Sequence, residues 1–439
     1  MKKLIAISVV FALVAGAAFA VDVGATVIGT VNVLQGDTGY DKDADESTKV
    51  RGSGGMNRVR IDGSGEANEN FGGYFRGDAG GGLTGNVWWK PVEQLKLQIG
   101  GNGGDGFIGK EGVTGWGFYQ TATDSGVAMG GDNVWGGSIY GYGLKTRYAF
   151  YEQGDGQEDL YLFITPMDML GINIILPFIS HKGEEAADIF KQTIAQIDVK
   201  MEGVGNIALT YVGGRGKFDG KDYVAGTDPD DYKKATVFTD ANGDKYYLGA
   251  GGAPVAITGD AGKAPYDEPA SIFLYYGGSF GDLSIDFGLG YHMATHDKGD
   301  DGSTHNLPIG IGLGVKYAME TLGVKFRTVV ALPMDSECDG MKILADVMPY
   351  FVISDNMTAF VSVGLGMKQP YKDQVDDAGE KVKSVTGWHF NPYLQVGEEW
   401  GAKFLFGIKA WSDGEKKYGK EGDATQVNWA IPIALHVSF

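Results

Sequence analysis

The sequence predicts an all-β fold and, more narrowly, a transmembrane antiparallel β-barrel of about 18 strands, within a range of 16–20. Three observations lead to this prediction. Apolar and polar residues alternate along many long segments, short turns alternate with long polar connections, and the chain ends in a segment that alternates at every position. A period of two places all the apolar side chains of a strand on one of its faces.

The first residues of the chain predict a signal peptide rather than a strand. Lys2 and Lys3 precede an apolar stretch that ends at Ala18-Phe19-Ala20, a small-x-small cleavage site. An amino-terminal core helix is the alternative reading. We therefore expect residues 1–20 to be removed and residues 21–439 to form the barrel.

Alternation then recurs along the rest of the chain. In 283–293, for example, Leu283, Ile285 and Phe287 alternate with Ser284 and Asp286. The predicted strands lie near 22–33, 56–64, 69–77, 83–90, 94–101, 158–165, 170–178, 194–201, 205–213, 270–278, 282–293, 308–318, 322–331, 343–353, 357–367, 388–397, 402–411 and 427–439.

The connections between these strands differ in length in a regular way. Short turns such as Glu202-Gly203 alternate with long polar segments, of which 102–157 and 214–269 are the longest. Short periplasmic turns and long extracellular loops are typical of outer-membrane barrels, and an even strand number places both chain ends on the short-turn side. Prolines at 349, 392 and 432 interrupt predicted strands, where each removes a ladder hydrogen bond and predicts a local bulge.

Composition excludes several other classes of protein. The formal net charge of −19 does not suit a protein that binds nucleic acid through its phosphates. Apart from residues 1–20, no apolar run reaches the ~18 residues of a membrane-spanning helix. The single Cys338 cannot form an internal disulfide, and we interpret it as an inert thiol.

The final segment, V-N-W-A-I-P-I-A-L-H-V-S-F, carries large apolar residues at every odd position from Val427 to Phe439. Its length suits a tilted bilayer crossing of roughly 9–11 residues. Strands can cross a bilayer only in a closed sheet, because lipid cannot satisfy exposed peptide groups. Aromatic residues near strand ends, Trp88 and Trp89 among them, are expected to form the interfacial girdles.

A barrel of this size has a bore too wide for side chains to fill, so the residues opposite the apolar face should line an aqueous channel. Arginines gather on neighbouring predicted strands of one wall, and lysines recur further round the barrel. The predicted pore-lining residues are Arg58, Arg60, Asp62, Tyr74, Arg76, Lys316, Lys325, Arg327, Lys403 and Lys409.

The chain resembles bacterial outer-membrane porins of the general diffusion type. The terminal strand ending in Phe439 is similar to the signal that the barrel-insertion machinery of these proteins reads. The resemblance also implies that the loop after the fifth strand, 102–157, enters the lumen as a constriction loop, with Asp105 and Glu111 as its acidic candidates, and that a homotrimer can form. The Pro-Glu-Phe-Gly-Gly motif usual in that loop is missing, so a surface loop remains the alternative. The hairpin 87–99 is similar to hairpins of large spirochaete outer-membrane barrels.

Enzymatic, metal and cofactor sites are not predicted. None of the histidines lies in a nucleophile motif, and His292-x3-His296 has no helix to bring its side chains together. Asp240-Ala-Asn242-Gly-Asp244 has calcium-loop spacing but Lys245 where that loop needs glycine. Asn242-Gly243 between two apolar segments instead predicts a hairpin in an extended loop.

Two functional classes follow from these observations. The first is a porin of a Gram-negative outer membrane, in contact with lipid, that admits small hydrophilic solutes and ions by passive diffusion. The second is a surface-exposed barrel scaffold, an adhesin or major surface protein, that binds a partner through loops 102–157 and 214–269. A substrate-specific channel lies between them, with the inward aromatic residues Tyr74, Phe273, Tyr275 and Tyr393 as a path for sugars.

Overall fold

The computed structural model describes residues 20–37, 51–79, 83–100, 107–108, 160–176, 193–213, 270–292, 309–332, 341–369, 383–397, 401–412 and 427–438, with short strands inside 215–268 and 417–425. The strands of the main sheet are β1 (Ala20–Asp37), β2 (Arg51–Asn68), β3 (Phe71–Asp78), β4 (Leu83–Val92), β5 (Leu95–Gly100), β6 (Leu160–Met167), β7 (Leu170–Leu176), β8 (Ile194–Met201), β9 (Gly205–Val212), β17 (Ser271–Phe280), β18 (Leu283–His292), β19 (Ile309–Ala318), β20 (Leu322–Leu332), β21 (Met341–Ser354), β22 (Met357–Gln369), β23 (Val385–Gly397), β24 (Lys403–Gly407), β25 (Lys409–Ser412) and β28 (Asn428–Ser438).

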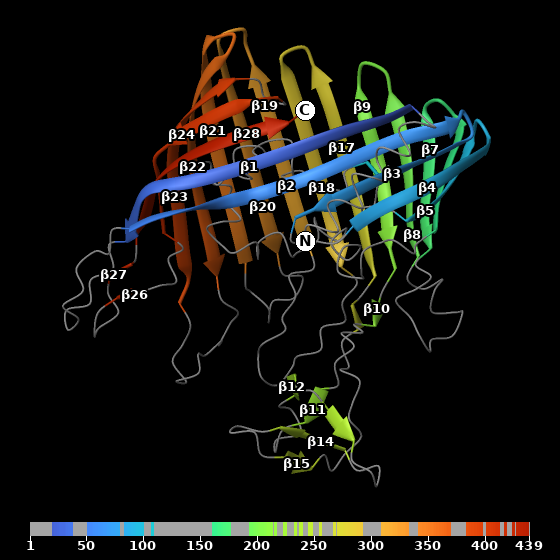
Figure 1. The fold of residues 1–439 in the computed structure, drawn as a ribbon, viewed down its shortest axis with the longest axis horizontal. Helices are drawn as coiled ribbons and strands as arrows, with labels where there is room; N and C mark the ends of the chain where they lie inside the picture. Colours follow the sequence, from blue (N-terminus) through green and yellow to red (C-terminus); the bar gives the residue numbers. More distant parts are fainter. Residues whose placement is uncertain are drawn as a thin grey trace.

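These strands form a closed barrel. Each pairs antiparallel with its neighbour in the chain, and β28 pairs with β1 to close the ring, with Thr26 opposite Ser438 and Asp37 opposite Asn428. β24 and β25 together occupy one position between β23 and β28, so the barrel has 18 antiparallel strands. The predicted fold class and strand number are therefore confirmed (Figure 1).

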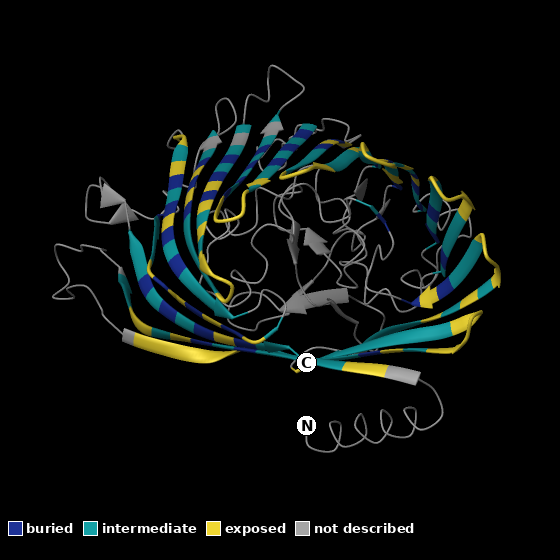
Figure 2. Ribbon diagram, turned by 90° about the horizontal axis from the view of Figure 1, so that it is seen from above, coloured by how far each residue is buried: buried dark blue, intermediate teal, exposed yellow. Residues whose placement is uncertain are grey.

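Burial distinguishes the two faces of the barrel wall. On β28, Leu435 is 57% exposed, whereas its neighbours Ala434 and His436 are 1% and 6% exposed. In a view along the barrel, differences in burial alternate in the same way along the strands of the ring (Figure 2). The exposed residues are apolar and face outward, as expected for a wall in contact with lipid, and the polar residues share the inner face.

One of the three prolines that interrupt predicted strands coincides with a register shift. Pro432 lies opposite Asn32, where the register of β1 shifts before Leu34. Pro392 lies on the strand that faces the break between β24 and β25, and its carbonyl accepts the amide of Ile408 at that break. The register is the same on both sides of Pro392, and Pro349 pairs with Val324 in a ladder that shows no shift, so the bulges predicted at these two prolines are not present.

The connection between β9 and β17 contains short strands of its own. β10 (Arg215–Gly216) pairs with β16 (Asp267–Glu268), and β11 (Tyr223–Ala225) pairs with β12 (Tyr232–Lys234). β13 (Val237–Thr239), β14 (Lys245–Leu248) and β15 (Pro254–Ala256) form a three-stranded sheet, so the two arms predicted on either side of Asn242-Gly243 do pair. β26 (Lys417–Tyr418) and β27 (Ala424–Thr425) pair in the connection before β28.

Some sequence predictions fall outside the described residues. These include all of the predicted signal peptide except Ala20, both acidic candidates Asp105 and Glu111, the terminal Phe439, and His296. In the part of the chain that the structure describes, no helix is both long and apolar enough to cross a membrane.

Candidate functional site

The candidate site is the inner wall of the barrel. Residues that face each other across two strands share a face of the sheet, so the register carries the inner face from one strand to the next. The inner face passes from His436 on β28 to Ile28 on β1, which faces it, and from Ile28 to Arg58 on β2. Continued round the ring, it includes every predicted pore-lining residue; their role in lining a pore remains a prediction.

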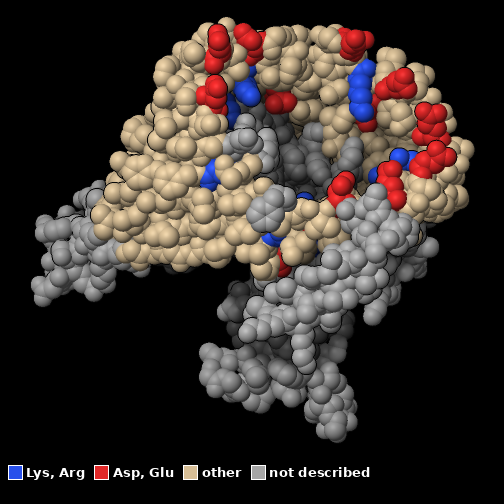
Figure 3. All heavy atoms as spheres, turned by 45° about the horizontal axis from the view of Figure 1, so that its top comes forward, with Lys and Arg blue, Asp and Glu red and all other residues tan. Residues whose placement is uncertain are grey.

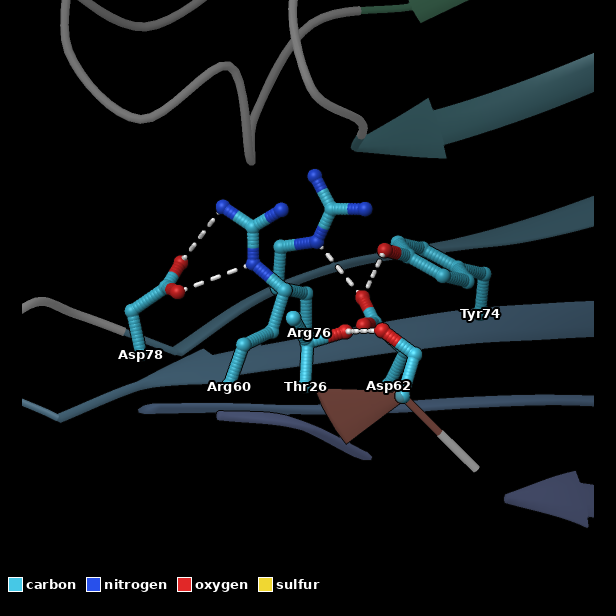
Figure 4. Close-up of polar contacts among 7 residues, drawn as sticks. Thr26, Arg60, Asp62, Tyr74, Arg76 and Asp78 are labelled. Carbon is cyan, nitrogen blue, oxygen red and sulfur yellow. Dashed lines mark hydrogen bonds and ion pairs between the residues drawn. The ribbon is translucent and has the colours of Figure 1, made fainter. Parts of the chain in front are cut away.

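A cluster of ion pairs joins β2 and β3 on this face (Figure 4). Arg60 donates to Asp78 through Nε at 2.9 Å and Nη2 at 3.3 Å, a two-point contact. Arg76 Nε and the Tyr74 hydroxyl both donate to Asp62 Oδ1, each at 2.6 Å. The Arg76 guanidinium also lies 5.5 Å from the centroid of the Tyr74 ring.

These ion pairs lower the positive charge that the sequence predicts for this part of the wall. The predicted group of Arg58, Arg60 and Arg76 faces two carboxylates, Asp62 and Asp78, which leaves a formal charge of +1. The paired side chains are only partly exposed, at 17–35%, so water screens their fields less than it would at the surface. The cluster is a rigid ladder of alternating charge with a small positive excess.

A second ion pair lies on the opposite side of the barrel. Arg327 on β20 donates to Asp346 on β21 at 2.5 Å, and the two side chains are 3% and 0% exposed. His389 Nε2 lies 3.0 Å from Ser362 Oγ and 3.5 Å from Asp346 Oδ1. A catalytic Ser-His-Asp triad would place serine and carboxylate on different ring nitrogens. Here both contacts use Nε2, so the arrangement does not have the geometry of a hydrolase.

A glycine makes room for this buried group. A Cβ atom built on Gly364 would overlap both Asp346 and His389, whose side chains lie across the glycine from the strands on either side. The side chains therefore lie flat along the wall and project little into the bore.

The predicted lysines of the inner wall occur in two settings. Lys316 and Lys325 face each other directly across β19 and β20. Lys403 faces His436, and Lys409 Nζ lies 5.5 Å from the ring of Trp411. Basic groups are thus distributed around much of the wall.

Acidic residues gather instead at the end of the barrel where the turns are short (Figure 3). Each short turn that the structure describes carries one carboxylate, and none carries a lysine or arginine. The residues are Glu69, Glu93, Asp168, Glu202, Asp282, Glu320 and Asp355.

The start of the connection between β5 and β6 contacts the inner wall. Ile108 donates its amide to Gln196 Oε1 and accepts a hydrogen bond from Gln196 Nε2, both at 2.8 Å. Phe107 is 5% exposed and packs among inner-face residues of β6 to β9. Its neighbours in this cluster are Tyr161, Ile175, Ile194 and Val212, with Phe163 and Phe273 alongside.

Gln196 is itself held in place by the wall. Its Nε2 also lies 2.7 Å from Thr210 Oγ1, and Asn173 Nδ2 donates to Asp198 beside it at 3.0 Å. Gln196 is 1% exposed. These amides were not among the residues predicted from the sequence. Their positions along β7 and β8 place them on the inner face, but Ile108, the partner of Gln196, is distant in the chain.

One aromatic residue departs from its predicted place. Trp89 is 44% exposed and stacks on Phe71 on the outer face, as a girdle residue should. Trp88 faces Gln98, which is 2% exposed and lies on the inner face. Consecutive residues of a strand point to opposite faces, so only one of the two tryptophans can contact lipid.

Within the described residues, no group of three or more His, Cys, Asp or Glu side chains is arranged to hold a metal ion. The wall offers charged pairs, amides and aromatic faces, which are suited to transient contact with dissolved solutes.

A closed barrel of 18 antiparallel strands, apolar outside and charged inside, has the architecture of porin-like transmembrane β-barrels. Among solved structures, OpdQ of Pseudomonas aeruginosa is similar at a TM-score of 0.45 and 8% identity, over 95% of this chain and 98% of that one. OmpF of Salmonella typhi gives 0.44 and 10% over 95% and 97% of the two chains. The loop L8 deletion mutant of OmpT from Vibrio cholerae gives 0.41 and 12% over 96% and 100%. No protein-family model and no curated protein sequence matches the chain, so the class rests on the topology of the barrel itself.

Proposed function

We propose that this barrel is an outer-membrane porin, a water-filled channel through which small hydrophilic solutes and ions diffuse passively. The observation that carries the proposal is the contrast between the two faces of the wall. The outer face exposes apolar side chains, whereas the inner face holds ion pairs and lysines that need water or counterions. Barrels of this strand number leave an aqueous lumen when side chains alone line the wall.

The connection 102–157 acts in this proposal as a constriction loop. The attachment of Phe107 and Ile108 to the inner wall supports it, because a loop that begins against the wall starts its course inside the barrel. The attachment lies near the end of the barrel where the connections are long, since Gln196 is close to the start of β8. The acidic candidates Asp105 and Glu111 flank the attached residues in sequence.

The remaining parts of the proposal concern assembly. Residues 1–20 direct secretion and are removed, the outer face contacts outer-membrane lipid, and Phe439 is read by the barrel-insertion machinery. A homotrimer is the proposed oligomeric state. Solutes pass without a cofactor and without chemical change.

Single-channel recording in planar bilayers tests the proposal. Purified, refolded barrel should give a conductance that rises in proportion to salt concentration and does not saturate with a sugar. Absence of conductance from heat-modifiable, correctly folded protein would overturn the porin function. Saturable block by a sugar would instead indicate a substrate-specific channel.

The scaffold function is favoured by one observation. The connection between β9 and β17 folds part of its length into the three-stranded sheet β13–β14–β15, which lies past the long-connection end of the barrel (Figure 1). A loop that serves only to join two strands has no need of such structure. Deleting residues 214–269 should leave conductance intact if the chain is a porin, and should abolish attachment to a partner if it is a scaffold.

A further inference from the structure

A cluster of two lysines and two aromatic rings lies on the inner wall at the short-turn end. Lys90 Nζ is 4.6 Å from the ring centroid of Trp88, and Lys96 Nζ is 5.8 Å from the same ring. Lys96 Nζ also lies 4.8 Å from the Phe163 ring, which stacks on Tyr161. The cluster spans the hairpin β4–β5 and the adjacent strand β6.

The register places the two lysines next to each other in the hairpin. Trp89 pairs with Leu97 and Val92 pairs with Leu95, so Lys90 and Lys96 fall at the irregular step between those pairs. Like charges opposite each other across strands destabilise a hairpin. Aromatic faces offset this repulsion only in part, because a cation–π contact at an accessible site contributes little. An anion that contacts Lys90 would offset part of this repulsion.

The cluster is also accessible. Trp88, Lys90 and Lys96 are each partly exposed, and they lie on the inner face with Gln98 and Tyr161. Within the described part of the chain, Lys90 forms no ion pair with a carboxylate. The site therefore combines positive charge with flat apolar surface where a solute passes the mouth of the lumen.

We propose that Trp88, Lys90, Lys96 and Phe163 form a binding site for organic anions that carry an aromatic ring, that is, aromatic carboxylates. The carboxylate accepts charge-assisted hydrogen bonds from the two ammonium groups. The ring of the solute packs against the indole and Phe163 in offset or edge-to-face contact. A small anion without a ring gains only the charged contact, so the site discriminates by ring as well as by charge.

This site would give the proposed channel a class of solute. Binding at the site does not require the porin function, but an effect of the bound solute on transport does. The chain provides matched controls. Trp89 is adjacent to Trp88 but lies on the outer face, and Lys316 faces Lys325 as a like-charged pair elsewhere on the inner wall. Replacing these control residues perturbs a tryptophan or a lysine pair without touching the proposed site.

The test compares benzoate with acetate on the refolded full chain in two assays. Saturation-transfer NMR in detergent micelles reports binding without requiring a channel, and current block in planar bilayers reports the effect on transport. Lys90→Gln should weaken benzoate binding by about tenfold, the effect of losing one charge-assisted contact. Trp88→Leu should abolish the preference for benzoate over acetate, whereas Trp89→Leu and Lys316→Gln should retain it.

The outcomes separate the two proposals. Benzoate binding that is lost in Lys90→Gln and Trp88→Leu but kept in the controls supports the site, even if no variant conducts and the porin function fails. Equal binding of benzoate and acetate by the unmodified barrel, or equal loss in all four variants, would overturn the site while leaving conductance as the separate test of the channel. Because Lys90 is partly exposed near the end of β4, Lys90→Gln provides a test that does not depend on the folding of Trp88→Leu.

Discussion

The attachment of the β5–β6 connection to the wall is weak enough that one substitution should release it. Burial of the Phe107 side chain contributes about 1.5–3 kcal/mol. The two hydrogen bonds between Ile108 and Gln196 contribute about 1 kcal/mol each. Ordering the backbone of these two residues opposes attachment by about 2–4 kcal/mol. Without the ring, the hydrogen bonds alone no longer exceed that ordering cost, and the attached state should cease to dominate.

Phe107→Ala should therefore change the channel without changing the barrel. Single-channel conductance is expected to become larger or noisier, because the loop is no longer fixed against the wall. Heat-modifiable mobility should stay the same, since Phe107 takes no part in the strand ladder. Leu209→Ala is the matched control, because Leu209 lies on the outer face of β9, 51% exposed, and contributes nothing to the attachment. Conductance and noise identical to those of the unmodified barrel would refute the constriction by this loop.

Three further predictions concern the wall and the chain end. Ile433→Arg should block assembly, because arginine on the lipid face near mid-membrane costs about 2–4 kcal/mol; Ile433→Ala is the control, and normal membrane levels of the arginine variant would contradict the register. Replacing Arg58, Arg60 and Arg76 together with glutamine leaves their two carboxylate partners and takes this part of the wall from +1 to −2, so the reversal potential in a salt gradient should shift toward cations; an unchanged potential would place the cluster away from the narrowest point. Deleting Phe439 should leave the secreted chain in the periplasm, and fractionation that finds it folded in the outer membrane would exclude this residue as the insertion signal.

The strands could be predicted from sequence because each carries its own alternation. Bulges at positions without a proline could not be predicted, because they depend on the neighbouring strand. Arg58 pairs with Ile28 but Met56 pairs with Gly29, so one residue is looped out between them and the faces exchange. Met56 is consequently 62% exposed on the outer face although it has the same parity as the inward Arg58.

The alternation along a single strand also could not identify which side chain of the neighbouring strand each residue contacts. The sequence placed Arg60 inside, but its partner Asp78 lies one residue past the predicted end of its strand. Arg327 was predicted as a pore-lining cation and lies on the inner face, but the sequence did not predict that the register pairs it with Asp346 and that both side chains are buried. The contact of Ile108 with Gln196 joins two segments far apart in the chain, for which a single sequence carries no signal.

Charge on this barrel is divided by location, and the division decides which ions the proposed channel favours. The formal net charge is −19, and the short-turn rim is acidic. Rim carboxylates stand in water, where salt at physiological strength screens them within about 8 Å. Basic groups of the inner wall, among them Lys90 and Lys316, face the interior of the barrel, where a low-dielectric wall would focus their field on ions in the proposed channel. We therefore expect the wall to outweigh the rim, so that the proposed channel favours anions although the protein carries a large negative charge.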